Sequence, residues 1–295
     1  MKSVRIVEVG MRDGLQNETM IFSIDQKFEF FKKLSDCGFK LIEVGAFVRS
    51  EKVPQMNESG KLIEVIKKQS GKTRIAALVP NEKGMMDAIQ SGVDEIAIFT
   101  AASETFCQKN INCSIDDSFE RFKPVIKLAK KHKIKIRGYL STAFACPFEG
   151  AISTKKATEV ATRLYRLGCY EISVGDTIGV ADPSSVEELF KKLKKNIPVS
   201  KLAGHFHDTR GTALANIFAA YKIGVRVFDS SIGALGGCPY APGATGNVAT
   251  EDVVYMFEKM GVKSGLNLQK LISCNHWLSG LMNKPLHSKV SKAGL

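Results

Sequence analysis

Residues 38–43 read Gly-Phe-Lys-Leu-Ile-Glu, so a glycine that can end a helix precedes a short apolar run typical of a β-strand. The arrangement recurs at residues 92–97 (Gly-Val-Asp-Glu-Ile-Ala), 168–173 (Gly-Cys-Tyr-Glu-Ile-Ser) and 224–229 (Gly-Val-Arg-Val-Phe-Asp). Four helix ends that each lead directly into a strand predict parallel strands connected by helices.

The other strands follow the same pattern on either side of these segments. Apolar or β-branched runs alternate with segments of helical period, which predicts eight strands at about residues 4–9, 40–46, 73–79, 94–99, 134–141, 170–175, 202–207 and 226–231. Eight such units in roughly 250 residues are typical of a barrel. We therefore expect an α/β fold, a (β/α)8 TIM barrel to about residue 262 with additional C-terminal helices over about residues 263–295. A doubly wound sheet fits less well, because no Gly-rich phosphate-binding turn follows the first strand.

The first predicted helix has clear local signals. Ser23 and Gln26 have the spacing of a capping box at its start. We expect Phe28, Phe31 and Leu34 to form its buried face, and the helix to end at the first of the glycines quoted above.

Composition indicates a folded globular protein. Apolar residues make up 44% and charged residues 24%, which excludes a disordered chain, and no Ser/Gly/Pro-rich linker suggests a boundary. We expect one catalytic barrel domain over residues 1–295. The seven cysteines are an odd number and residues 1–10 have the pattern of a strand, so we expect no disulfide framework and a cytoplasmic protein. No window approaches the roughly 18 consecutive apolar residues of a membrane helix, so we expect no membrane partner.

The chain is basic, with 42 Lys plus Arg against 30 Asp plus Glu, a formal net charge of +12. That charge suits nucleic acid, an anionic membrane surface or a phosphorylated small molecule equally well. The lysine-rich stretches 127–135 and 191–195 lie in predicted helices whose opposite faces are apolar. We interpret them as solvated helix faces and expect no nucleic-acid partner. A basic nucleic-acid-binding protein remains the alternative from another functional class.

The seventh predicted strand ends in His205-Phe206-His207. Side chains two apart on a strand share a face, so both imidazoles can point to one site while Phe206 packs against the surrounding helices. Two imidazoles that point to the same site can bind one metal ion together, which favours a metal site over a structural role. Barrel closure makes the eighth strand the neighbour of both the first and the seventh, so Asp13 can supply a third ligand.

A glycine-rich loop, residues 233–247, follows the eighth strand and predicts a mobile lid. Asn247 at its end offers an amide oxygen to the same site. Two imidazoles, a carboxylate and a carbonyl oxygen suit Mg²⁺ or Mn²⁺, with Zn²⁺ chemically possible. Cys238 lies within this loop, where proton transfer or redox sensitivity is an alternative to simple packing.

Further polar residues are expected at the strand ends, where a barrel carries its reactive groups. Residues 12–18 bring a cation, a carboxylate and amides to the end of the first strand, unless they form only a solvated loop. Glu43 and Asp176 are candidate acids of the barrel interior. The alternative is that each of them forms an ion pair with Arg12 or Arg137.

Several segments together carry a resemblance to a known family, and the last of them is the most specific. They are residues 8–18 within VEVGMRDGLQNE, VPQM (53–56), KNINCS (109–114), GDTIGV (175–180), HDT with ALANI (207–217) and GGCPYAPGATGNVATEDVVYM (236–256). Over nearly its whole length the sequence resembles the 3-hydroxy-3-methylglutaryl-CoA lyases, members of a group of metal-dependent barrel lyases and synthases.

The resemblance implies retro-Claisen cleavage of 3-hydroxy-3-methylglutaryl-CoA, a CoA thioester, to acetyl-CoA and acetoacetate with one divalent cation. The implied metal ligands are Asp13, His205, His207 and Asn247, and the implied active-site residues are Arg12, Gln16, Glu43, Asp176 and Cys238. We expect Arg12 to stabilise the enolate, Cys238 to protonate it, and Asp13 or His205 to act as the initial base. We expect Arg12, Gln16, Arg137 and Asn247 to bind substrate. A homodimer is expected by analogy with the family, with the residues after 262 as its candidate surface.

The sequence departs from the family pattern at Met11, Ala46, Lys52 and Arg210. Arg210 adds a cation to the loop after the strand with the two histidines, where a substrate carboxylate or phosphate is a candidate partner. A lyase for a related 3-hydroxyglutaryl-CoA analogue is therefore one alternative. A Claisen-condensing synthase of the same group is another, although the cysteine loop favours a lyase.

Overall fold

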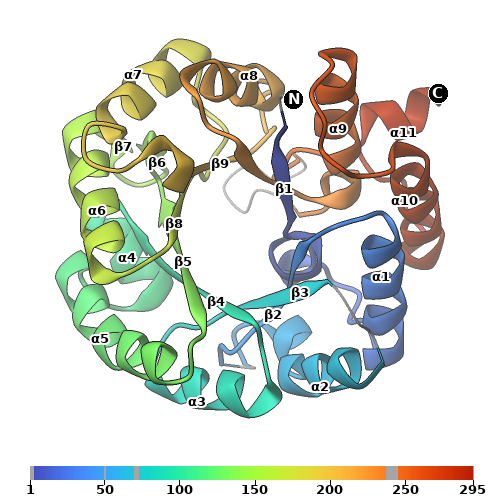
Figure 1. Ribbon diagram of the computed structural model, residues 1–295, viewed down its shortest axis with the longest axis horizontal. Coiled ribbons are helices and arrows are strands. Elements are labelled where there is room, and N and C mark those ends of the chain that lie inside the picture. The colour runs from blue at the N-terminus through green and yellow to red at the C-terminus, as the bar shows by residue number, and fades with distance from the viewer. Residues whose placement is uncertain (1–2, 50, 70–72, 237–244, 295) are drawn as a thin grey trace.

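The computed structural model describes residues 3–49, 51–69, 73–236 and 245–294. Eight parallel strands close into a barrel in the order β1-β10-β9-β8-β5-β4-β3-β2 (Figure 1). The strands are β1 (Arg5–Glu8), β2 (Leu41–Ala46), β3 (Arg74–Leu78), β4 (Glu95–Ala101), β5 (Lys135–Ser141), β8 (Glu171–Asp176), β9 (Leu202–Phe206) and β10 (Val227–Ser230). The predicted TIM barrel is confirmed, and each predicted strand coincides with an observed one to within a few residues.

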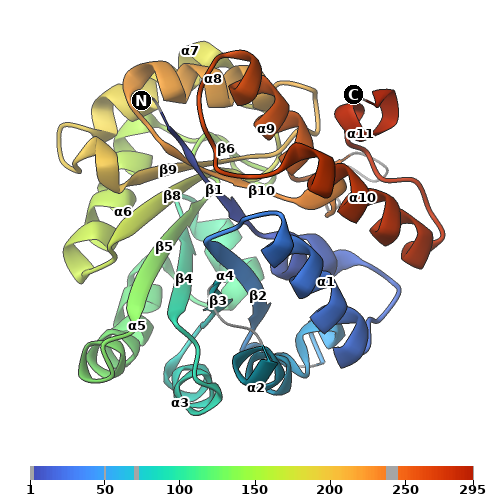
Figure 2. The same cartoon turned by 45° about the vertical axis from the view of Figure 1, so that its right-hand side comes forward.

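Helices surround the strands on the outside of the barrel, as Figure 1 shows. They are α1 (Ile24–Asp36), α2 (Ser59–Gln69), α3 (Glu82–Ser91), α4 (Glu104–Ile111), α5 (Ile115–Lys131), α6 (Thr154–Leu167), α7 (Pro183–Leu193), α8 (Ala213–Ile223) and α9 (Thr250–Lys259). The additional helices α10 (Leu268–Met282) and α11 (Lys289–Ala293) follow, and Figure 2 shows α10 beside α1 and α9. Among the described residues, none of the helices is both long enough and apolar enough to span a membrane.

The local signals of α1 act as expected at both ends. Ser23 and Gln26 form a complete capping box, and Gly38 adopts a left-handed φ of 103° just beyond the helix. Leu34 is fully buried as predicted. Phe28 is only partly buried, because the face that packs against the barrel is shifted to Phe30.

Some short elements were not predicted, and two of them follow barrel strands directly. A hairpin of β6 (Ala145–Cys146) and β7 (Gly150–Ala151) follows β5, and a five-residue π-helical turn (Gly10–Gly14) follows β1. The wide π turn is rare and is often found at functional sites. It begins the segment that carries Arg12 and Asp13.

The main hydrophobic core lies between the strands and the outer helices. Phe206 shows how a strand divides its side chains between that core and the barrel interior. It points outward, where its ring lies 6.3 Å from that of Phe144 and 6.4 Å from that of Phe190. The residues on either side of it, His205 and His207, therefore face the other way, toward the interior.

Candidate metal-binding active site

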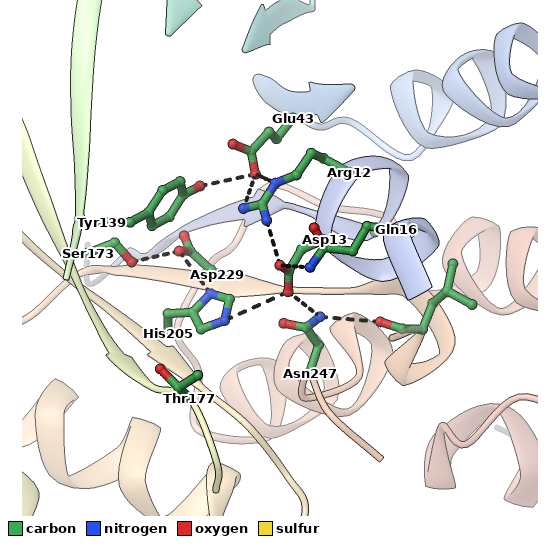
Figure 3. Close-up of polar contacts among 12 residues, drawn as sticks. Arg12, Asp13, Gln16, Glu43, Tyr139, Ser173, Thr177, His205, Asp229 and Asn247 are labelled. Atoms are coloured by element: carbon green, nitrogen blue, oxygen red, sulfur yellow. Dashed lines mark hydrogen bonds and ion pairs between the residues drawn. The ribbon is translucent and has the colours of Figure 1, made fainter. Parts of the chain in front are cut away.

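The closing seam of the barrel brings three distant segments together at the strand ends. β10 pairs with β1 on one side and with β9 on the other, and Asp229 of β10 lies in register with His205. Beyond the strands, His207 forms an isolated bridge with Asn247. The π turn after β1 then places Asp13 beside these residues, as Figure 3 shows for Asp13, His205 and Asn247.

Asp13, His205 and His207 form a cluster with metal-ligand geometry. One potential ligand atom from each lies within 4.8 Å of the others, and His205 Nε2 is 4.0 Å from Asp13 Oδ2. Nδ1 of His207 is buried and has no hydrogen-bond partner in the described part of the chain. A buried, unpaired imidazole nitrogen beside a carboxylate fits a bound cation, because such a nitrogen is otherwise costly.

Asn247 is the fourth expected ligand, and its amide orientation fits that role. Its Nδ2 donates to Asp13 Oδ2 at 2.8 Å and to the backbone oxygen of Leu235 at 3.3 Å. These bonds occupy the amide protons and leave the side-chain oxygen as the atom that can contact a cation. A set of two imidazoles, a carboxylate and an amide oxygen suits Mg²⁺, Mn²⁺ or Zn²⁺.

Arg12 is held from two sides. Its Nε donates to Glu43 Oε2 at 2.8 Å, and its Nη1 donates to Asp13 Oδ1 at 2.5 Å. Gln16 Nε2 also donates to Asp13 Oδ1, at 3.2 Å. Glu43 is thus the ion-pair partner of Arg12, which was the alternative considered for it.

The surroundings set the protonation of the cluster. Burial alone would raise the pKa of Asp13, but the charges of Arg12, His205 and His207 outweigh it and lower the pKa to about 2. Burial, together with the neighbouring His205, lowers the pKa of His207 to about 4. An ionised carboxylate and a neutral imidazole are the forms that bind a metal ion, so Asp13 and His207 are suited to do so. At His205 burial acts to lower the pKa, but the hydrogen bond to Asp229 and the charge of Asp13 outweigh it and raise the pKa.

A large cavity opens above the cluster. Its volume is about 1680 Å³, and its lining includes Arg12, Asp13, Gln16, His205 and His207. Acidic side chains contribute to its outer part, which also carries six cations, Arg49, Lys52, Lys61, Lys83, Lys109 and Arg121. A cavity of this kind can hold an extended ligand whose anionic groups face the outer part.

The family model described as HMGL-like matches residues 3–277, nearly the whole chain. The chain belongs to the HMGL-like family. A cytoplasmic 3-hydroxy-3-methylglutaryl-CoA lyase of Rattus norvegicus is 49% identical over 98% of this chain and 84% of its own. A 3-hydroxy-3-isohexenylglutaryl-CoA/hydroxymethylglutaryl-CoA lyase of Pseudomonas aeruginosa is 46% identical over 99% of this chain and 97% of its own. The crystal structure of a hydroxymethylglutaryl-CoA lyase from P. aeruginosa superposes with a TM-score of 0.96 at 46% identity, covering 99% of this chain and 97% of that one.

Four of the described predicted site residues of this HMGL-like protein lie outside the cavity lining: Glu43 and Asn247, whose contacts are given above, and Arg137 and Asp176. Arg137 is fully buried, and its guanidinium contacts Glu171 and Asp229 at 2.8 and 2.7 Å. Arg137 thus forms ion pairs within the barrel, and its expected contact with the substrate stays a prediction. The carboxylate of Asp176 accepts from the backbone nitrogens of Val180 and Ala181, both at 3.0 Å, so it orders the loop after β8.

Arg210 and Cys238 are two other residues that the sequence singled out. The exposed Arg210 donates from Nη1 to the backbone oxygens of Ile178 and Gly179, at 2.8 and 3.1 Å. Its cation therefore joins two loops and does not line the cavity. Cys238 lies outside the described residues.

Sequence reasoning missed the polar residues deeper in the HMGL-like barrel. Asp229 contacts His205 Nδ1 at 3.3 Å, and Ser173 donates to Asp229 at 2.7 Å. Tyr139 donates to Glu43 Oε2 at 3.3 Å. A signal was present for Asp229, because an acid inside a buried strand requires a buried partner.

Proposed function

We propose that this protein is a divalent-metal-dependent carbon–carbon lyase that cleaves 3-hydroxy-3-methylglutaryl-CoA to acetyl-CoA and acetoacetate. The observation that carries the proposal is the meeting of Asp13, His205 and His207 beside Arg12, on the floor of a large cavity with cations in its outer part. The names of the similar proteins agree with this chemistry.

Asp13, His205, His207 and Asn247 would hold the cation, which we propose to be Mg²⁺ or Mn²⁺. Bound there, the cation would act as a Lewis acid toward the hydroxyl and carboxylate oxygens of the substrate. Asn247 and Gln16 both donate to Asp13, so they hold its carboxylate in a fixed orientation.

The reaction breaks the bond between C2 and C3. A base removes the C3 hydroxyl proton, the C3–O bond becomes a carbonyl as acetoacetate forms, and the bonding electrons pass to C2 as a thioester enolate. Asp13 is the candidate base, and His205 could take that role only in a state in which its Nε2 is not bound to the cation. Arg12 would stabilise the enolate oxygen, with its guanidinium already oriented by Glu43.

Protonation of the enolate carbon gives acetyl-CoA. We propose Cys238 as the donor, on the basis of its place in the sequence between Asn247 and the strand that ends at Ser230. In the test, Cys238→Ala and Arg12→Ala should both lose turnover. Near-normal turnover of Cys238→Ala alone would exclude the thiol as the donor.

The CoA thioester is the proposed partner, and the net charge of +12 supports attraction of its phosphates. A substrate with a longer substituent at C3 is the second candidate substrate, because the P. aeruginosa relative is named for both an isohexenyl and a methyl substrate. We also propose a cytoplasmic location. The described cysteines support it, since all six are free. The homodimer remains a prediction.

The deciding experiment measures acetoacetate. Metal is removed from the purified protein with a chelator, Mg²⁺ or Mn²⁺ is restored, and 3-hydroxy-3-methylglutaryl-CoA is supplied. Metal-dependent acetoacetate is expected, and Asp13→Asn should abolish it. If only the isohexenyl analogue gave product, that analogue would replace 3-hydroxy-3-methylglutaryl-CoA as the proposed substrate. Condensation of acetyl-CoA with a 2-oxo acid would indicate a Claisen-condensing synthase. No metal-dependent product from any of these would refute the proposal.

A further inference from the structure

Asp229 lies directly behind one of the two metal-site histidines. It belongs to β10, in register with His205 of the neighbouring β9, and it is buried within the barrel. Its Oδ2 lies 3.3 Å from His205 Nδ1, on the side of the ring away from Asp13 (Figure 3). The imidazole therefore lies between two carboxylates, Asp229 at Nδ1 and Asp13 toward Nε2.

Other side chains fix the Asp229 carboxylate. Arg137 donates from Nη1 to Oδ2 at 3.0 Å, and its Nη2 lies 2.7 Å from Oδ1. The hydroxyl of Ser173 donates to Oδ2 at 2.7 Å. Arg137 is itself fixed by Glu171, which accepts from its Nε at 2.8 Å. Side chains of two neighbouring strands, β5 and β8, thus hold one carboxylate in one orientation.

This arrangement determines which nitrogen of His205 carries the proton. A carboxylate paired with a buried guanidinium is only an acceptor, so His205 Nδ1 must donate to it. In the neutral ring the lone pair then lies on Nε2, which faces Asp13 and the rest of the cluster. His207 differs, because its Nδ1 has no hydrogen-bond partner among the described residues.

We propose that Asp229 is a positioning residue that fixes the tautomer and ring orientation of His205, so that Nε2 is presented to the metal ion. The proposal rests on the proposed metal-dependent function and adds to it the group that prepares one ligand. Partners of this kind typically change metal affinity by about 10- to 100-fold when they are removed. Asp229 does not touch the substrate in this scheme.

The test uses Asp229→Asn, which keeps the size of the side chain and removes its charge. Mn²⁺ is titrated into the metal-free protein, and its binding is followed by the electron paramagnetic resonance signal of free Mn²⁺. We expect the Kd to rise about 10- to 100-fold. Nitrogen NMR of ¹⁵N-histidine-labelled, metal-free protein should also show that His205 loses its preference for the Nδ1–H tautomer. If Asp229 only stabilised the fold, its replacement would not change the tautomer of His205.

Glu95→Gln is the matched control, because Glu95 is also a buried strand carboxylate, paired with Arg74 and Tyr170 away from the histidines. It should lower thermal stability and leave the Mn²⁺ Kd and the His205 tautomer unchanged. If Asp229→Asn does not fold, Asp229→Asn combined with Arg137→Gln removes both charges of the pair and should weaken Mn²⁺ binding in the same way.

The outcomes separate the two proposals. Wild-type protein that binds no Mn²⁺ would overturn the metal-dependent function. Wild-type binding together with a Kd within twofold in the folded Asp229 variant, or with an unchanged tautomer, would overturn only the positioning role.

Discussion

Glu43 Oε2 lies 2.8 Å from Nε and 2.7 Å from Nη2 of Arg12, so one buried carboxylate oxygen holds two nitrogens of the same guanidinium. The grip leaves Nη1 directed at Asp13. The direction of the Arg12 guanidinium is therefore set by a residue of β2 that is not itself one of the candidate metal ligands.

Glu43→Gln tests this relationship. The amide keeps the shape of the side chain but loses the charge, so Arg12 should lose its fixed orientation. We expect kcat to fall about 10- to 100-fold with a small change in KM, because the lost interaction acts mainly in the transition state. Steady-state kinetics measure this. Glu29→Gln, which removes an exposed partner of two lysines, should keep both constants, and equal losses in the two variants would contradict the role of Glu43.

Gly236→Ala should disturb the candidate metal site by displacing Asn247. Gly236 has a left-handed φ of 110°, and an added Cβ would lie 2.9 Å from Asn247 Nδ2 and 3.2 Å from the Cα of Gly14. We expect Asn247 to shift away from Asp13 and the Mn²⁺ affinity to fall about 10-fold. Gly92→Ala is the control, since its φ is also left-handed but its Cβ would meet no atom within 4 Å. It should cost only about 1 kcal/mol of stability and leave metal binding intact. Equal metal affinity in both variants would argue against the contact.

Arg210→Ala decides between a substrate contact and a link between loops. Because the guanidinium binds backbone oxygens and lies outside the cavity lining, we expect KM for the CoA thioester to stay within about twofold. A small decrease in melting temperature should accompany the loss of the link. A tenfold rise in KM would show that Arg210 contacts substrate after all.

The stability of the protein should depend on pH through Glu8. Burial raises the pKa of this carboxyl to about 8, against the lowering effect of hydrogen bonds from Thr250, Ile232 and Gly10. The folded state then binds a proton that the unfolded state has released above its own pKa, near 4.5. The contribution of Glu8 is therefore present at low pH and lost as the pH rises from about 4.5 to about 8, by at most about 1.4 kcal/mol per pH unit.

Denaturant unfolding of wild-type protein and Glu8→Gln between pH 5 and 8 measures this contribution. The wild-type free energy of unfolding should fall more steeply with pH than that of the variant. Parallel curves would show that Glu8 is ionised throughout this range.

The sequence predicted the barrel because the signals for helix ends agreed with the positions of the predicted strands. Gly92, Gly168 and Gly224 each end a helix in the left-handed conformation that the repeat indicates, and a strand follows each of them. The hairpin β6–β7 was missed because its strands are two residues long, too short for any alternation to appear. The π turn depends on packing at the end of β1 and has no local signature.

The candidate site, too, could be predicted only in part. The spacing of His205 and His207 determined their common direction, and barrel closure determined their approach to Asp13. Arg137 and Asp176 were harder to assign, because strand alternation gives the face of a residue but not its depth in the barrel or its partner. Ion pairing with Asp229 holds Arg137 below the cavity, and two backbone nitrogens hold Asp176.

The candidate metal site spans the junction at which the first strand of the barrel pairs with the last. During synthesis on the ribosome, Asp13 emerges long before the segment that includes His205, His207 and Asn247. A chain that stops before β10 retains Asp13 and Arg12, and β1 keeps β2 as a neighbour but lacks the strand that closes the barrel on its other side. The candidate site is therefore complete only when the segment that ends at Asn247 has also been synthesised and folded.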